Sequence, residues 1–166
     1  MNWYSSENDD SIGGGFRNPV IGSGNVFIVS DSNKLYQYNM KLPSGAISGS
    51  AQTPTLYHTF DYDIVNSPAI TEDYIIIATG QMAQGGHINH IYAIPKDNIS
   101  KPPVWDYTNN NIPICYSSSP VVAGDSIFIT SWGGDNGVYT LEKNRYANNK
   151  LLCLDLKNEN KTWQKE

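Results

Sequence analysis

Long apolar runs are missing from this sequence, in which no stretch approaches the roughly 18 to 20 residues that a membrane-spanning helix needs. The N-terminus, MNWYSSENDD, is polar and acidic, and this excludes a signal peptide within the chain. Localisation stays open at this point, because a segment cut from a secreted protein would have the same features.

Charged residues are also scarce, at 16% of the chain, where an ordinary globular protein has about a quarter. The formal net charge is −5 and no run of basic residues is present, so a nucleic-acid partner is excluded. Hydrophobic residues make up 39%, which is a globular rather than a disordered composition. Asn, Ser, Gly, Tyr and Thr fill the remainder and favour turns and strands over helices.

Cysteine is nearly absent, with only Cys115 and Cys153. Two cysteines cannot form a structural zinc site by themselves, and no Cys-x-x-Cys spacing is present. We therefore expect both to be small buried hydrophobic residues, and we predict no metal and no cofactor for this chain.

One phrase occurs three times, and each copy begins at a proline: Pro19, Pro68 and Pro120. Apolar residues follow each proline, then a polar turn (GSGN, TED or AGD), then a run rich in Val, Ile, Phe and Tyr. Such runs suit a pleated strand, and the turn residues suit a hairpin. The spacing of roughly 50 residues is typical of propellers and solenoids.

Two further elements recur after each hairpin. Alternating apolar residues predict a third strand in KLYQYNM, HIYAIPKD and KLLCLDLKN. A fourth strand is expected around Trp105 and around Trp163, with Tyr57 and Phe60 in place of tryptophan in the first copy. Four antiparallel strands in each unit describe a propeller blade, so the predicted fold class is an all-β propeller.

The copies divide the chain into one partial propeller domain, 1–166. Residues 1–17 are predicted to hold the outer strand of a preceding blade, because Trp3 lies 16 residues before Pro19 and Trp105 lies 15 residues before Pro120. Three full blades follow, with predicted bounds of 18–66, 67–118 and 119–166.

The segments KLLCLDLKNENKTWQKE and HIYAIPKDNISKPPVWDYTNNNIPICYSSSPVV resemble the quinoprotein (PQQ-type) propeller repeat. In that repeat, a strand ending in Leu-Asp is followed by a polar turn and a tryptophan. The superfamily includes quinoprotein dehydrogenases and the outer-membrane assembly lipoprotein BamB. Pro95 replaces the usual aspartate, and the usual glycine after the turn is absent from all three copies, so the chain resembles a divergent member.

Three blades do not close a ring, since propellers close with about four to eight. Open sheet edges invite pairing with another chain. Two explanations fit: the chain is a piece of a longer propeller, or two copies form a homodimer that completes a six-bladed ring. The expected partners are therefore a protein or the remaining blades.

Functional residues are expected on the face formed by the loops after the second and fourth strands of each blade. The loops after the second strand lengthen from the first copy to the third, and insertions in repeat proteins concentrate on the binding face. The predicted binding residues on this face are Trp132, Asp135, Tyr139, Arg145, Tyr146, His87 and His90.

Each of these residues also has a structural interpretation. His87 and His90 have a spacing compatible with metal ligands, but solvated loop histidines are the favoured interpretation, because no third ligand lies nearby. Asp135 lies in an Asp-Asn-Gly segment that is more typical of a turn than of a calcium loop. The aromatic and arginine residues are types enriched in binding hot spots, and they could equally pack the long loop onto the blade.

The function predicted first is a non-catalytic binding or scaffold module in an extracellular or cell-envelope protein. The second hypothesis is a fragment of a quinone-dependent dehydrogenase, and the third is a carbohydrate-binding propeller. The adjacent cysteines that many quinoprotein enzymes carry beside their cofactor are absent, and no catalytic residue is assigned.

Overall fold

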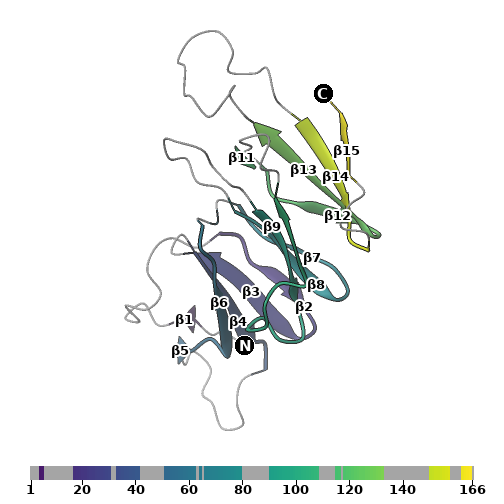
Figure 1. Cartoon of the computed structure of the whole chain (residues 1–166). Coiled ribbons are helices and arrows are strands. Elements are labelled where there is room, and N and C mark those ends of the chain that lie inside the picture. The colour runs from purple at the N-terminus through teal and green to yellow at the C-terminus, as the bar shows by residue number, and fades with distance from the viewer. Residues whose placement is uncertain are drawn as a thin grey trace, which may run out of the picture.

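The computed structural model describes most of the chain outside the long loops. The described residues are 4–5, 17–30, 33–41, 51–62, 64, 66–79, 90–108, 115–116, 118–132, 150–157 and 162–165. Regular structure in these residues consists of β-strands, and within them no helix is long and apolar enough to cross a membrane. Three antiparallel sheets follow one another along the molecule (Figure 1).

The sheets correspond to the three sequence copies. Blade one is β2 (Val20–Gly22), β3 (Asn25–Ser30), β4 (Lys34–Asn39) and β6 (Leu56–Thr59), and blade two is β7 (Ala69–Ile70), β8 (Tyr74–Ala78), β9 (His90–Pro95) and β10 (Trp105–Thr108). Blade three is β12 (Val121–Ala123), β13 (Ser126–Trp132), β14 (Lys150–Asp155) and β15 (Thr162–Lys165), with β11 (Cys115–Tyr116) also pairing with β13. The prediction of four-stranded antiparallel blades is confirmed. Each innermost strand begins directly after its proline, where no ladder donor is lost.

The N-terminal strand pairs outside these blades. β1 (Tyr4–Ser5) runs parallel to β5 (Ala51–Gln52), which lies between β4 and β6 in the sequence. The N-terminal segment therefore lies beside residues of the first copy. The assignment of 1–17 to a preceding blade stays a prediction.

The inner hairpins turn in different ways. Blade one uses a two-residue turn in which Ser23 and Gly24 both have positive φ, at 52° and 73°, as a type I′ turn requires. Blade two has no positive φ in its turn, and the Thr71 hydroxyl instead accepts hydrogen bonds from the backbone N–H groups of Asp73 (3.2 Å) and Tyr74 (2.8 Å). In the turn of blade two, hydrogen bonds to the Thr71 side chain thus take the place of the positive φ angles found in blade one.

The outer strand of blade one corrects a sequence assignment. Trp105 pairs with Ala93 and Trp163 pairs with Cys153. The equivalent pair in blade one is Leu56 with Gln37, so Leu56, and not Tyr57, occupies the tryptophan position. Leu56 packs against the same core as the buried side chain of Phe60.

Alternation along the strands gives each blade two apolar faces, which form two separate cores. We call the face of a blade that is directed toward the preceding blade in the sequence its start face, and the opposite face its end face. The end face of blade one packs on the start face of blade two, and the end face of blade two packs on the start face of blade three. The first core, seam 1–2, contains Phe27, Val29 and Leu35 of blade one with Ile75, Ile77, Tyr92 and Ile94 of blade two. The second core, seam 2–3, contains Ile76, Ala78 and Ile91 of blade two with Ile127, Ile129, Leu152 and Leu154 of blade three.

The innermost strands approach each other closely across seam 1–2. β2 lies against β7, and a Cβ atom on Gly22 would fall 2.3 Å from Cδ1 of Ile70. β7 in turn lies against β12. The innermost strands therefore follow one another in the order expected around a propeller axis.

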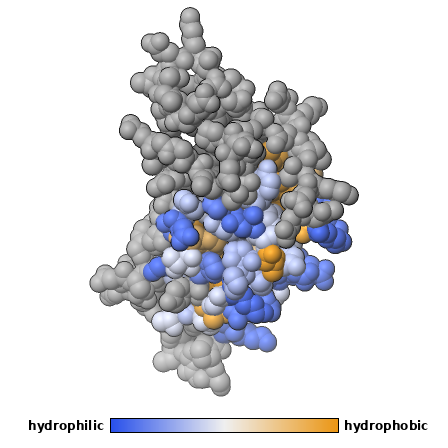
Figure 2. Space-filling view, in the orientation of Figure 1, coloured by the Kyte–Doolittle hydropathy of each residue, from blue (hydrophilic) through white to orange (hydrophobic). Residues whose placement is uncertain are grey.

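The two ends of the blades differ. One, the turn end, carries the inner hairpin turns and the turns that follow β4, β9 and β14. The other, the loop end, carries the connections that follow the second and fourth strands of each blade. In Figure 2, the described part of one face of the molecule is mainly hydrophilic, with isolated hydrophobic residues.

Candidate functional site at the loop end of seam 1–2

The structure describes only part of the predicted binding set. His87, Asp135, Tyr139, Arg145 and Tyr146 lie outside the described residues. Trp132 ends β13, where its backbone pairs with Cys115, and its side chain also lies outside the description. His90 is therefore the one predicted site residue whose side-chain surroundings are described.

His90 begins β9 at the loop end, on the face of blade two that packs against blade one. Its Nδ1 lies 2.7 Å from Oδ1 of Asp106 on the neighbouring strand β10. The side chain of His90 is only 13% exposed, whereas that of Asp106 is 42% exposed. The interpretation of His90 as a solvated loop histidine is therefore wrong, because burial between two blades and a carboxylate partner fix the ring.

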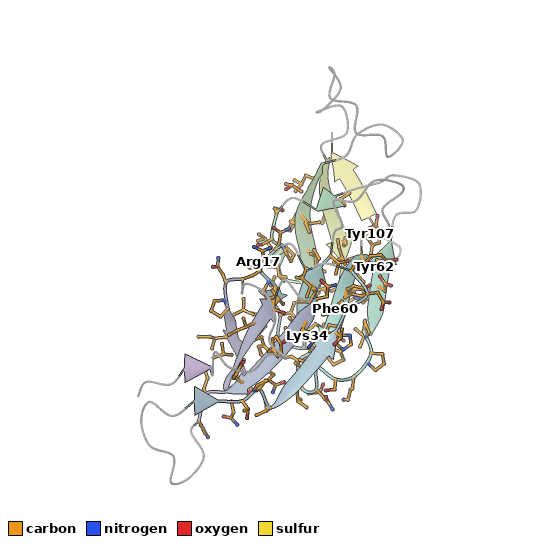
Figure 3. The ribbon with its side chains drawn as sticks, turned by 90° about the vertical axis from the view of Figure 1, so that its left-hand side faces the viewer. Arg17, Lys34, Phe60, Tyr62 and Tyr107 are labelled. Atoms are coloured by element: carbon orange, nitrogen blue, oxygen red, sulfur yellow. The ribbon has the colours of Figure 1, made fainter. Side chains whose placement is uncertain are left out.

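Aromatic rings enclose the imidazole. The ring of Tyr92, two residues further along β9, stacks on His90 with centroids 5.1 Å apart and an interplanar angle of 6°. Tyr62, in the connection after β6, stacks on His90 at 4.9 Å and 21°. Phe60 contacts Tyr92 at 5.1 Å. These residues form a ring cluster, which we define as Phe60, Tyr62, His90, Tyr92 and Asp106; Figure 3 labels Phe60 and Tyr62 where the chain leaves blade one.

Hydrogen bonds with Thr79 fix the backbone position of His90. The N–H of the fully buried Thr79 donates to the carbonyl of His90 (2.9 Å), and the N–H of His90 donates to the hydroxyl of Thr79 (3.3 Å). The Nε2 atom of His90 is buried and finds no hydrogen-bond partner among the described residues. The carboxylate of Asp106 is an acceptor, so the contact at Nδ1 is a hydrogen bond when that nitrogen carries the proton.

The surroundings of Tyr92 oppose its ionisation. Burial is the largest cause that raises the pKa of its phenol, followed by the negative charges of Asp106 and Asp61 and by Tyr62. Tyr92 therefore remains a neutral, stacking side chain well above its ordinary titration range. The cluster lies at the loop end of seam 1–2 and connects residues of both blades.

The solvent-facing part of this region is aromatic and acidic. Tyr62 is partly exposed and Asp61 is exposed, so an aromatic ring and a carboxylate face the solvent beside the buried imidazole. Among the described residues, no group of three or more His, Cys, Asp or Glu side chains is placed to hold a metal ion. The free Cys153 is buried in blade three, remote in the fold from this cluster.

Sequence reasoning missed Phe60, Tyr62, Tyr92 and Asp106 as partners of His90. The three segments that carry them are joined by strand pairing and by packing between blades. One signal was available: the register of a β9–β10 hairpin pairs His90 with Thr108 and Tyr92 with Asp106, which places the carboxylate diagonally from the imidazole. The contribution of blade one could not be found in this way.

Comparison with solved structures is informative for this chain. No family model matches the sequence, and no curated protein matches it. Among solved structures, the crystal structure of BamB from Moraxella catarrhalis is similar, with a TM-score of 0.51 and 13% sequence identity over 88% of this chain.

The fold is a BamB-like β-propeller. At this level of identity the likeness concerns the fold, and the resemblance read from the repeated segments is confirmed at that level. The chain spans 38% of the length of that BamB chain.

Proposed function

We propose that this chain is a non-catalytic binding or scaffold module that recognises a protein partner through its loop end. The observation that carries the proposal is the ring cluster. It combines a partly exposed tyrosine, Tyr62, with an imidazole and the carboxylate of Asp106, at the end of the blades where the long connection between β13 and β14 emerges.

The physical support is preorganisation. A binding surface loses less entropy on association when its side chains are already held in place, and the stacking of Tyr62 and of Tyr92 on His90 restricts these rings. Tyrosine supplies a large contact area with a polar tip and is enriched in binding hot spots. The proposal includes an extracellular or cell-envelope location, which rests on the resemblance to the quinoprotein-like repeat.

The test is affinity capture from the source cells with two matched charge reversals. Asp61→Lys changes an exposed residue at the loop end, and Glu72→Lys changes an exposed residue in the inner turn at the turn end. We expect a protein that is enriched by the wild type and by Glu72→Lys but is lost with Asp61→Lys. Equal capture by all three proteins would contradict recognition at the loop end.

A parallel measurement addresses the other hypotheses. The protein is titrated with pyrroloquinoline quinone and calcium, and separately with soluble oligosaccharides, by calorimetry. A binding module for proteins gives no saturable heat with either. Stoichiometric binding of the quinone would replace the proposal by the dehydrogenase hypothesis, and binding of a sugar would replace it by the carbohydrate hypothesis.

A further inference from the structure

Two carboxylates flank the ring cluster at the loop end. Asp106 approaches Nδ1 of His90 with one oxygen, at 2.7 Å, and its side chain is 42% exposed. Asp61 is exposed and directly precedes Tyr62, whose ring stacks on His90. Both negative charges raise the pKa of the Tyr92 phenol. The two carboxylates therefore lie around one ring, although Asp61 follows blade one and Asp106 belongs to blade two.

These two charges have no lysine or arginine partner among the described residues. The ion pairs found there join Asp106 to His90, and Asp97 and Asp125 to lysines at the turn end. The chain as a whole is also acidic, with a formal net charge of −5. A cation that approaches Asp61 and Asp106 is therefore attracted by both carboxylates.

Unpartnered polar atoms lie in the same place. Tyr92 is 8% exposed, and its hydroxyl makes no hydrogen bond with a described residue. Nε2 of His90 is buried and also lacks a partner among these residues. Leaving such atoms unsatisfied costs free energy, which a bound donor would remove. The carboxylate oxygens of Asp61 and Asp106 only accept hydrogen bonds, so a donor is the group that is missing.

The aromatic surroundings favour a positively charged donor over a neutral one. Tyr62 is partly exposed and stands beside the exposed Asp61. The face of a tyrosine ring attracts a positive charge, and a guanidinium group can stack on a ring while it donates two hydrogen bonds to one carboxylate. Lysine and arginine side chains carry donors and no acceptor. An acceptor-rich, acidic and aromatic site matches these side chains better than an amide or a hydroxyl.

We propose that Asp61, Tyr62 and Asp106 bind a basic side chain, from lysine or arginine, which the partner protein presents at the loop end of seam 1–2. The occupant is selected by charge complementarity and by the supply of donors. This inference rests on the proposed function, because the partner protein supplies the side chain. It adds the chemistry of the contact, and it predicts that binding weakens as salt screens the carboxylates.

The first test titrates the folded chain with N-acetylarginine amide and follows the tyrosine ring resonances by NMR, assigned with Tyr62→Phe and Tyr92→Phe. N-acetylcitrulline amide is the control probe, because it has nearly the same shape without the charge. We expect a saturable shift at Tyr62 with the arginine probe, and binding of the citrulline probe that is weaker by about fivefold or more. Equal binding of the two probes, or no shift at Tyr62, would overturn the proposal.

Matched variants then test the carboxylate. Asp61→Asn should weaken binding of the arginine probe by about threefold, whereas Asp61→Glu keeps the charge and should retain binding. Glu72→Gln, at an exposed position of the turn end, should leave binding unchanged. Unchanged binding with Asp61→Asn would also overturn the proposal.

The probe separates this inference from the function on which it rests. A chain that captures a protein through its loop end but does not bind the arginine probe contradicts the basic side chain as the ligand and leaves the binding function in place. A chain that binds the probe but captures no protein contradicts the binding function. The two experiments therefore fail independently.

Discussion

At the scale of single residues, His90 shows how a side chain acquires its role from its surroundings. The sequence places it at the start of a strand, where a loop histidine is the ordinary expectation. In the structure, Asp106, Tyr62 and Tyr92 come from three different segments and bury the ring. No local pattern contains that information, because packing between blades brings Tyr62 to His90.

The contact between His90 and Asp106 gives the first prediction. Asp106→Ala removes the partner of a largely buried ring nitrogen, so the free energy of unfolding should fall by about 1 kcal/mol. Asp97→Ala is the control, because it breaks an ion pair with Lys101 in which both side chains are mostly exposed, and it should change nothing measurable. Urea unfolding compares them, and equal effects would show that the contact in the cluster contributes no more than a surface pair.

The phenol of Tyr92 gives a prediction about alkaline pH. Its pKa is raised in the folded chain, chiefly by burial and then by Asp106, Asp61 and Tyr62. The stabilisation is therefore complete below the ordinary value of 10.0 and is lost as the pH rises above it, because the unfolded chain releases this proton first. Tyr92→Phe should lose stability less steeply above pH 10, measured by urea unfolding at several pH values. Parallel pH curves for the two proteins would be inconsistent with a shifted phenol.

At the scale of strands and turns, the sequence was most informative. The proline, the hairpin and the third strand recur with side chains whose alternation is visible without a structure, and all three copies form these elements. The fourth strand of blade one was assigned less well. Tyr57 resembles tryptophan in its side chain, but hydrogen-bond register selects Leu56, and a shift of one residue moves a side chain to the other face.

The inner turn of blade one gives a prediction at this scale. Gly24 has a φ of 73°, and a Cβ atom there would meet nothing within 4 Å, so only backbone strain opposes a side chain. Gly24→Ala should lower the free energy of unfolding by about 1 kcal/mol. Ser23→Gly relieves a positive φ at the neighbouring position and should be neutral or slightly stabilising. Thermal unfolding would contradict this account of the turn if both variants had the same midpoint.

At the scale of the whole molecule, the three described blades pack on one another in the order of the sequence. Each seam is a separate core, and blade two contributes to both through opposite faces of the same strands. Ile76 and Ile77 are consecutive and fully buried, yet they belong to different seams. The repeated sequence pattern predicted that apolar residues alternate between the two faces of each strand. Only the structure shows which of these faces packs on which neighbouring blade.

A double-mutant cycle across seam 2–3 tests this arrangement most directly. Ile76→Val and Ile127→Val are combined, with Ile77→Val and Ile127→Val as the control pair, and unfolding free energies are measured in urea. Each single change should cost about 0.5–1.5 kcal/mol. We predict a coupling of about 0.5 kcal/mol for Ile76 with Ile127 and additivity for Ile77 with Ile127. Coupling of Ile77 that equals or exceeds that of Ile76 would contradict the stacking of blades through alternating faces.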